Sequence, residues 1–513
     1  MGKRCIVIGL DGASPIVLEW AKEGKLPNIA KLMEDGISGE LASTIPFFSA
    51  VAWASFLTGK NPGKTGIFGW TKRIMGTYDT RSVNSNDLYP ASPLWKLLED
   101  ASQKGIFVGI PMTSPPHKID GVIIGGLPAH EIKAYPLEVD AKIKEFGFDV
   151  VAKKEESMED FYQLNSKQAK VVFYLLENYE WTFFIVNFQA HQHWFQHGMV
   201  LEQCQDLDQI VGQIADKLDR DTSIIIMSDH GTMPVYKDVN IGNLLQKLKL
   251  LKLKETSTKP SKKLLSEFGI TRNKISRILN KATFGHVPRN SLAYRMVQKG
   301  LGALPSMVSS KSLQVADVDW SQTKAFSLEP DGIFINLKKR EAEGIIARGS
   351  EYEKLRDYII SELLELKDPD NGTRVIKEVY RKEEIYKGLY ADLAPDLLIV
   401  SSYGYRLSIG NLDGEVISKT RRKTYQERDG ILIIKGADIQ RGKEIEKTDI
   451  IDLAPTILHI LGEPIPRDVD GRVLKEIFSK QSEFGRQPIT YRETDGKSKI
   501  QQKVKELKLR GEI

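Results

Sequence analysis

Four residues of the chain have the types and positions needed to hold a divalent cation and activate a nucleophile: Asp11, Ser49, Asp229 and His230. Asp11 directly follows the apolar run "RCIVIGL", and Asp229 and His230 follow the apolar run "SIIIM". Two carboxylates, an imidazole and a hydroxyl oxygen form a suitable ligand set for Zn²⁺ and an acceptable one for Mn²⁺. Coordination would lower the pKa of the serine hydroxyl, which would make its alkoxide available for phosphoryl transfer.

Each of these residues also has a simpler structural explanation. Asp11 with Gly12 suits a turn after a strand, and Ser49 in "PFFSAVAWASFLTG" is placed as the N-cap of a helix that stops at Thr58 and Gly59. The two roles of Ser49 are compatible, because free backbone amides at a helix N-terminus, here those of Ser49 and Ala50, can hold a phosphate. For "SDHG" a ligand role is favoured, since a purely structural charge beside a buried strand would be costly.

The elements that must position these residues are strands of an α/β fold. Strands alternating with helices indicate a mainly parallel sheet covered by helices on both faces. Ligands of such sheets bind outside the carboxyl ends of the strands, which is where the four residues fall. The apolar runs that predict the strands are "RCIVIGLDG", "GIFVGIP", "GVIIGG", "TFFIVNF", "SIIIMSDHG", "PDLLIVS" and "ILIIKG".

A Lys-rich stretch interrupts this pattern. It begins "NIGNLLQKLKLLKLKETSTKPSKKLL", has a helical period and contains few strand signals, and the α/β pattern resumes at "TKAFSLEPDGIFINL". The sequence therefore predicts a first part of the core at 1–239, a mostly helical insertion or cap at 240–312, a second part of the core at 313–479 and a polar tail at 480–513. The lysines of the insertion indicate a solvated helix face or, alternatively, a contact with an acidic membrane surface or an anionic substrate.

Composition narrows the class of protein. The 513 residues are 41% hydrophobic and 27% charged, which suits a globular chain with a large core. A net charge of +5 from 73 basic and 68 acidic residues does not indicate a nucleic-acid partner. No apolar run is long enough to cross a membrane, and the two cysteines are far apart, so we expect a protein of the cytoplasm without a transmembrane segment.

The segments "IVIGLDGASP", "FFSAVAWASFLTGKNPGKTGIFGW", "MSDHG", "EEIYKGLYADLAPDLLIV" and "DIIDLAPTILHILGEPIPRDVDGRVL" resemble a known group. In order and spacing they are similar to the alkaline phosphatase superfamily, and within it to the microbial branch of type I phosphodiesterase/nucleotide pyrophosphatase-like proteins. The resemblance implies an alkaline-phosphatase-like α/β core with two metal ions bridged by phosphate. By position, Asp11, Ser49, Asp229 and His230 match the ligands of the ion that also holds the nucleophile.

The second metal site departs from the family pattern. The family's Asp-x-x-x-His is replaced by Gln189-x-x-x-His193, and its late histidine falls at Gln426. A neutral glutamine is a poor ligand for Zn²⁺, so we expect one tightly bound ion, Zn²⁺ or else Mn²⁺ or Mg²⁺, rather than two. His191 or His197 would offer a replacement ligand, because His193 and His197 are spaced i, i+4; the alternative is that both are packing or surface residues.

Two further departures concern specificity. The histidine of the family's "PGKHGI" is Thr65, and the asparagine of nucleotide pyrophosphatases aligns with Trp70, so nucleotide specificity is not implied. The sequence predicts a metal-dependent phosphoric ester hydrolase with Ser49 as its nucleophile, acting on a phosphorylated or other anionic small molecule. The alternative is a non-catalytic or weakly active relative that binds such a ligand, or a partner, through the remaining half-site.

Overall fold

The main sheet is built around β1 (Arg4–Leu10), which pairs in parallel with β8 (Phe183–Phe188) and with β9 (Thr222–Met227). In this computed structural model, which describes residues 3–129, 131–148, 157–189, 198, 200–254, 317–410 and 414–493, the sheet has ten strands. Their order is β19-β2-β18-β9-β1-β8-β5-β6-β7, with β20 beside β2. The remaining strands of this sheet are β2 (Gly36–Ala42), β5 (Gly105–Ile110), β6 (Gly121–Gly125), β7 (Ala134–Tyr135), β18 (Asp429–Lys435), β19 (Lys443–Glu444) and β20 (Thr448–Asp449).

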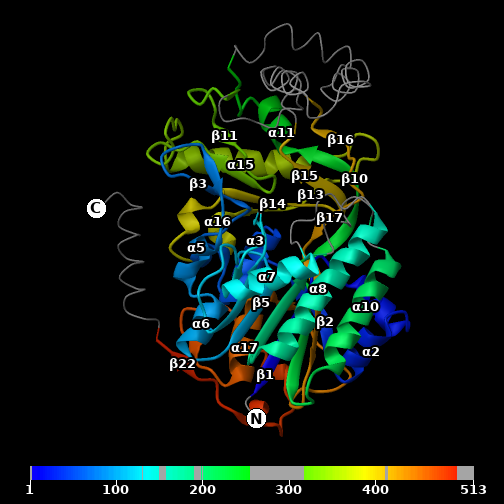
Figure 1. Cartoon of the computed structure of the whole chain (residues 1–513). Coiled ribbons are helices and arrows are strands. Elements are labelled where there is room, and N and C mark those ends of the chain that lie inside the picture. The colour runs from blue at the N-terminus through cyan, green and yellow to red at the C-terminus, as the bar shows by residue number, and fades with distance from the viewer. Residues whose placement is uncertain are drawn as a thin grey trace, which may run out of the picture.

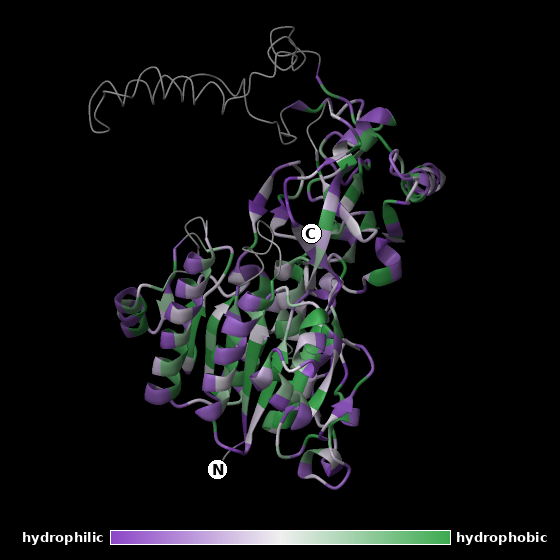
Figure 2. Cartoon of the chain, turned by 90° about the vertical axis from the view of Figure 1, so that its right-hand side faces the viewer, coloured by the Kyte–Doolittle hydropathy of each residue, from purple (hydrophilic) through white to green (hydrophobic). Residues whose placement is uncertain are grey.

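Side chains of the central strand alternate between two hydrophobic cores, one on each face of the sheet. Cys5 and Val7 belong to one core, and Ile6 and Ile8 to the other. The hydrophobic strands lie between helices whose outer surfaces are hydrophilic (Figure 2). This arrangement confirms the predicted α/β fold with a mainly parallel sheet and flanking helices. The first core is covered by α3 (Ser49–Thr58), α6 (Leu94–Asp100) and α17 (Leu453–Leu461), and the second by α1 (Ile16–Lys22), α2 (Pro27–Glu34), α7 (Leu137–Phe146), α8 (Met158–Asn178) and α10 (Leu201–Asp216).

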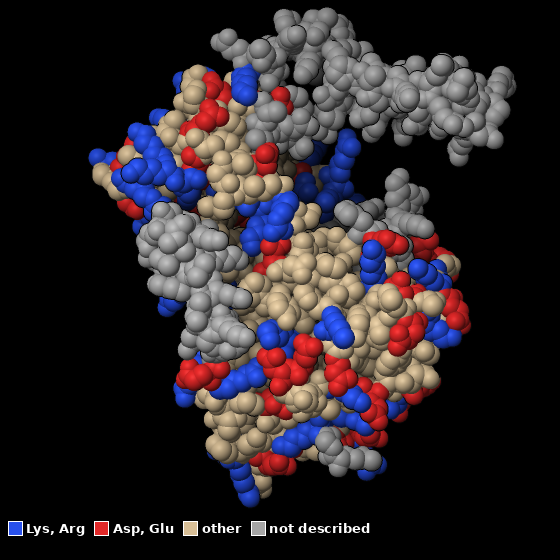
Figure 3. Space-filling model, turned by 60° about the vertical axis from the view of Figure 1, so that its left-hand side comes forward, with Lys and Arg blue, Asp and Glu red and all other residues tan. Residues whose placement is uncertain are grey.

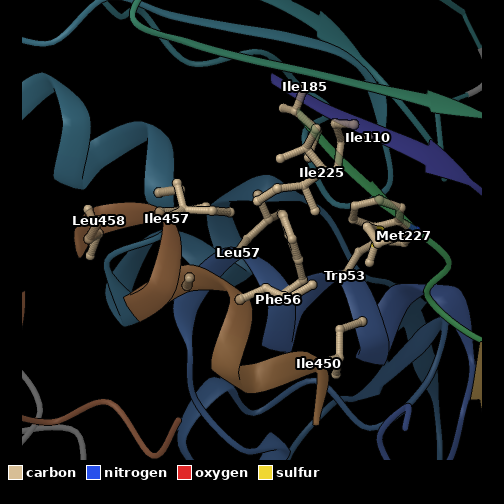
Figure 4. Close-up of a cluster of buried hydrophobic side chains, with 14 of the residues drawn as sticks. Trp53, Phe56, Leu57, Ile110, Ile185, Ile225, Met227, Ile450, Ile457 and Leu458 are labelled. Atoms are coloured by element: carbon tan, nitrogen blue, oxygen red, sulfur yellow. The ribbon is translucent and has the colours of Figure 1, made fainter. Parts of the chain in front are cut away.

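Helix α3 is fixed against the sheet because every one of its ten residues is buried. Figure 4 shows its Trp53, Phe56 and Leu57 gathered with Ile225 of β9 and Ile457 of α17. The helix stops where predicted, at Gly59, whose φ of 65° is left-handed. Two ion pairs hold the following turn, from Lys60 to Asp468 and from Lys64 to Asp470.

A smaller part with its own hydrophobic core lies beyond the carboxyl edge of the main sheet (Figure 1). It contains one sheet in the order β15-β10-β16, with β17 beside β10, and a second in the order β11-β12-β14-β13. Six of the seven apolar runs form strands of the main sheet, whereas "PDLLIVS" forms β14 here. The elements of this smaller part include β10 (Gly231–Asn240), α11 (Ile241–Lys247), β11 (Ala325–Phe326), β12 (Gly332–Ile335), α15 (Ser350–Glu365), β13 (Ile376–Arg381), α16 (Lys382–Ile385), η4 (Ala391–Leu393), β14 (Leu397–Ser401), β15 (Gly404–Ser408), β16 (Ile417–Lys419) and β17 (Thr424–Glu427).

Short elements connect or flank these two parts. They are α4 (Pro62–Thr65), β3 (Thr71–Arg73), β4 (Thr80–Ser82), α5 (Ser85–Leu88), η1 (Tyr89–Ala91), η5 (Ile450–Asp452), β21 (Ile465–Pro466), η6 (Lys475–Ile477), α18 (Glu483–Arg486) and β22 (Tyr491–Arg492). Most of the Lys-rich insertion, from 255, and the tail from 494 lie outside the described residues. The predicted domain boundaries, the helical character of the insertion and its membrane contact therefore stay predictions.

The charge distribution on the surface and the apolar character of the helices are relevant to binding of nucleic acid or membrane. Basic and acidic side chains are mixed over the face drawn in Figure 3, in line with the nearly balanced charge of the chain. Across the described ranges, no helix combines the length and apolar character that a membrane crossing requires. The predicted cytoplasmic location stays a prediction.

Candidate metal and nucleophile site

Two neighbouring strands bring three charged or titratable side chains together at their carboxyl ends. Asp11 follows β1, and Asp229 and His230 follow β9, its parallel neighbour. One ligand atom from each of the three lies within 4.8 Å of the others. All three side chains are buried, with exposed fractions of 1% for Asp11 and 0% for Asp229 and His230. A donor set of this size and composition is able to surround one divalent cation.

Ser49 joins this group from the first turn of α3. Its Oγ lies 3.1 Å from Nε2 of His230. The N-cap position belongs to Phe48 rather than to Ser49, whose hydroxyl points into the cluster and makes no capping bond. The first helical hydrogen bonds run from the amides of Val51 and Ala52 to the carbonyl of Phe48. The amides of Ser49 and Ala50 precede these bonds, so the helix itself does not use them.

The tautomer of His230 follows from its second hydrogen bond. Its Nδ1 lies 2.9 Å from the carbonyl oxygen of Gly231. A carbonyl oxygen only accepts, so Nδ1 carries the proton and the neutral ring presents the lone pair of Nε2 to the cluster. Nε2 lies 3.6 Å from Oδ1 of Asp11 and 3.6 Å from Oδ2 of Asp229. This is the arrangement in which a histidine can ligate a cation, with its other nitrogen held by backbone.

The two buried carboxylates of the cluster, Asp11 and Asp229, are stabilised as anions if a cation lies between them. Burial raises the pKa of the Asp229 carboxyl well above its usual range, and the nearby charge of Asp11 raises it further. Contacts with the Ser49 hydroxyl and the Gly12 amide offset part of this rise, although in the described part of the chain neither oxygen of Asp229 has a hydrogen bond of normal geometry. A buried carboxylate in this position is costly unless a cation compensates it. The residues present therefore fit a divalent ion in both charge and donor chemistry.

Asn187 of β8 orients Asp11 and could not be selected from the sequence alone. Its Nδ2 donates to Oδ2 of Asp11 over 3.0 Å, and its side chain is fully buried. Asn187 stands beside Gly9 in the β1–β8 register. A Cβ added at Gly9 would lie 2.7 Å from Oδ1 of Asn187 and 2.9 Å from the Trp53 ring. Gly9 is thus required for the asparagine to reach the aspartate.

Two hydrogen bonds join the turn after β1, which carries Asp11, to the segment after β9, which carries His230. Ser14 donates through its hydroxyl to the carbonyl of Thr232 over 2.6 Å, and the Thr232 hydroxyl donates to the carbonyl of Gly12 over 2.7 Å. These bonds join the turn after Asp11 to the start of β10, directly after His230. They tie the segment that carries Asp11 to the segment that carries His230.

The side chain of Gln426 contacts His230 of the cluster, whereas the side chain of Gln189 bonds to a backbone carbonyl instead. Gln426 lies opposite Thr232 in the antiparallel β10–β17 pair, with its Nε2 2.9 Å from Nε2 of His230. Because that histidine nitrogen accepts, the amide of Gln426 donates to it. The amide of Gln189 instead donates to the carbonyl of Gly109 over 3.3 Å. His193, with His191 and His197, lies outside the described residues, so the predicted remnant ligand stays a prediction.

Comparisons with known proteins identify the family of the chain and structures with which it shares its fold. The family described as type I phosphodiesterase / nucleotide pyrophosphatase matches residues 5–427. Phosphonoacetate hydrolase from Sinorhizobium meliloti 1021, solved with phosphonoacetate, is 13% identical with a TM-score of 0.56, and the match covers 90% of this chain and 95% of that one. Human ectonucleotide pyrophosphatase / phosphodiesterase 5 is 12% identical with a TM-score of 0.49 and the same coverage. No curated protein sequence matches. At this identity the phosphonoacetate hydrolase match shows a shared fold.

Proposed function

The chain belongs to the type I phosphodiesterase / nucleotide pyrophosphatase family of the alkaline phosphatase superfamily, and on that premise we propose that it is a metal-dependent hydrolase of phosphate esters with Ser49 as its nucleophile. The family is one of phosphoric ester hydrolases. The observation that carries the proposal is the approach of the Ser49 hydroxyl, at the start of a buried helix, to a buried Asp-Asp-His group. The proposed substrate is a phosphorylated or otherwise anionic small molecule.

Asp11, Ser49, Asp229 and His230 are the proposed ligands of one tightly bound cation, Zn²⁺ or else Mn²⁺ or Mg²⁺. When bound, such an ion supplies Lewis-acid stabilisation of the serine alkoxide and of negative charge on the phosphoryl group. The protein contributes the geometry. Gly231 holds the His230 ring in the tautomer that leaves Nε2 as a donor atom, and Asn187 fixes Asp11.

The chain's own residues account for the reaction in two displacements. Ser49 Oγ releases its proton to solvent and attacks phosphorus, so that an Oγ–P bond forms and the bond to the ester oxygen breaks. The leaving oxygen takes a proton from solvent. The amides of Ser49 and Ala50, which α3 does not use, donate to the phosphoryl oxygens. Water then attacks phosphorus and gives up a proton to solvent, the Oγ–P bond breaks, and the serine oxygen takes up a proton from solvent to regenerate the hydroxyl.

Gln426 and Gln189 are neutral residues at the two positions where the family pattern has ligands of a second metal ion. We infer that the amide of Gln426, displaced from His230 when Nε2 ligates a cation, becomes a hydrogen-bond donor for a phosphoryl oxygen. A neutral donor stabilises developing charge less than a dication does, so the reaction is expected to be slower than in a two-metal site.

The same contact favours the second candidate function, a non-catalytic binder of an anionic ligand. The Gln426 amide donates to the lone pair of His230 that a cation needs. If it stays there, the cation loses one of its ligands. The two functions differ in whether Ser49 is required for turnover.

The experiment compares the wild type with Ser49→Ala on generic phosphomonoester and phosphodiester substrates, with Zn²⁺, Mn²⁺ or Mg²⁺. Ser55→Ala is a matched control, because Ser55 lies in the same helix with a buried hydroxyl that makes no described hydrogen bond. Loss of the nucleophile is expected to lower kcat by about 10³-fold or more. Equal rates of wild type and Ser49→Ala would refute the enzyme proposal. Metal analysis of protein prepared without chelator is expected to give one equivalent; two tightly bound equivalents would refute the single-ion site.

A further inference from the structure

A cavity lies between the β3–β4 hairpin and the smaller part of the molecule, and it shares no lining residue with the Ser49 cluster. Its volume is about 150 Å³. Phe68, Phe334 and Leu393 contribute apolar wall, and Glu329 is a polar group beside them. Apolar cavities of about 150 Å³ accommodate a molecule of the size of benzene. The space therefore fits one six-membered ring.

Each basic residue around this cavity pairs with a carboxylate, and two of these carboxylates are shared, Asp87 with Arg81 and Asp396 with Lys382. Lys72 pairs with Asp87 at 3.2 Å, and Arg73 pairs with the buried Glu341. Arg340 pairs through both terminal nitrogens with Asp396, at 2.7 and 2.6 Å. An anionic ligand would have to compete with these intramolecular partners for the basic side chains.

The negative charge at the cavity is not compensated in the same way. Glu329 accepts hydrogen bonds from the hydroxyl of Thr71, at 2.7 Å, and from its backbone amide. Within the described ranges, neither Glu329 nor Asp392, which also lines the cavity, forms an ion pair. Burial raises the pKa of the Glu329 carboxyl. Gly69 lets the side chain pack closely, since an added Cβ would lie 3.1 Å from Cγ of Glu329. A fixed acceptor thus lies next to an apolar space.

We propose that this cavity binds a small ring-bearing amine, with the ring between Phe68, Phe334 and Leu393 and the ammonium group donating to Glu329. The apolar walls remove the ring from water, and the ammonium group supplies the charge that the carboxylate lacks. An uncharged ring without a donor would cover Glu329 without giving it a further hydrogen bond. The site is separate from the Ser49 chemistry and does not depend on it.

The test measures binding of three benzyl probes to the intact chain by ligand-observed NMR: benzylammonium, benzyl alcohol and benzoate. Benzylammonium is expected to bind most tightly, benzyl alcohol more weakly and benzoate not at all. Glu329→Gln keeps the side-chain shape and is expected to weaken benzylammonium binding roughly tenfold or more, because it removes a charge-assisted hydrogen bond. Glu365→Gln, at the exposed end of α15, is the control and is expected to bind like the wild type.

A second variant, Leu393→Trp, fills the cavity and is expected to abolish binding of both benzylammonium and benzyl alcohol. Thermal unfolding of each variant establishes that it is folded before binding is measured. The proposal is overturned if the wild type binds no benzylammonium, if benzyl alcohol binds equally well, or if Glu329→Gln binds benzylammonium like the control. Retained binding in folded Leu393→Trp would place the ligand elsewhere and overturn it as well.

Discussion

The side-chain amide of Asn187 donates to Oδ2 of Asp11 across 3.0 Å, at the carboxyl ends of two paired strands. This bond occupies one oxygen of the aspartate. It leaves Oδ1 on the side of His230, 3.6 Å from Nε2. A neutral amide therefore orients a proposed cation ligand without adding a third negative charge to a buried pair of carboxylates.

Replacing Asn187 by alanine is expected to weaken cation binding. Partners that orient metal ligands typically contribute about 10- to 100-fold in affinity, and a loss in that range is expected for Zn²⁺ or Mn²⁺ measured by calorimetry. Asn165→Ala is the control, since Asn165 is also buried and donates to a carboxylate, that of Asp206, outside the cluster. Equal affinities for the two variants would show that Asn187 has no special role in the site.

A methyl group at Gly9 is expected to disturb the same contact from the neighbouring strand. The added Cβ would lie 2.7 Å from Oδ1 of Asn187 and 2.9 Å from the Trp53 ring, both below normal contact distance. Overpacking of this kind costs about 1–3 kcal/mol. Urea unfolding of Gly9→Ala should show this loss, and Gly125→Ala, whose Cβ would come no closer than 3.2 Å to a neighbour, should lose less. The reverse order would contradict the packing argument.

Restoring the family's ligand types is expected to change the number of bound ions. In Gln189→Asp with Gln426→His, a carboxylate and an imidazole replace two neutral amides, and metal analysis should show an increase from one equivalent towards two. The single variant Gln426→Ala is the control: it removes the donor from His230 without adding a ligand, so stoichiometry should stay at one. An unchanged stoichiometry in the double variant would mean that these positions are not the second site.

The sequence located Asp11, Asp229 and His230 because each directly follows a buried strand, and parallel neighbours bring their carboxyl ends to one edge. The same reasoning does not predict the role of Asn187. It lies inside the apolar run "TFFIVNF", and its role depends on the register that sets it beside Gly9, far away in the sequence. For Ser49 the sequence indicated the start of a helix, but the direction of its hydroxyl depends on how α3 packs against the sheet.

The placement of strands shows the same division between local and long-range information. The run "PDLLIVS" has the composition of a buried strand, and it is one, yet β14 pairs antiparallel with β13 in the smaller part. An apolar run reports burial on both faces but not the identity of its neighbours. Gln426 was located by its spacing from Gly430, whereas its contact with His230 follows from the β10–β17 register.

Asp396, just before β14, is the buried centre of a polar network in the smaller part. Its two oxygens accept from Arg340 at 2.7 and 2.6 Å, from the Tyr352 hydroxyl at 2.8 Å and from the Ile335 amide at 2.7 Å. Burial alone would raise the pKa of the Asp396 carboxyl, but the charge and hydrogen bonds of Arg340 outweigh it and hold that pKa well below its usual range. The folded state therefore strongly prefers the ionised form.

Stability should consequently depend on pH through Asp396. A carboxyl whose pKa is lower in the folded than in the unfolded state stabilises fully above its unfolded pKa, about 3.9, and this contribution is lost as pH falls towards the folded pKa. Removing one partner of a buried ion pair costs about 3–5 kcal/mol, so Asp396→Asn should lose about this much at pH 7. In urea unfolding at pH 7, 5 and 3, the difference from wild type should be similar at pH 7 and 5 and smaller at pH 3. Glu365→Gln, an exposed carboxylate without such partners, should stay close to wild type throughout, and a difference for Asp396→Asn that does not shrink at pH 3 would contradict the assigned direction.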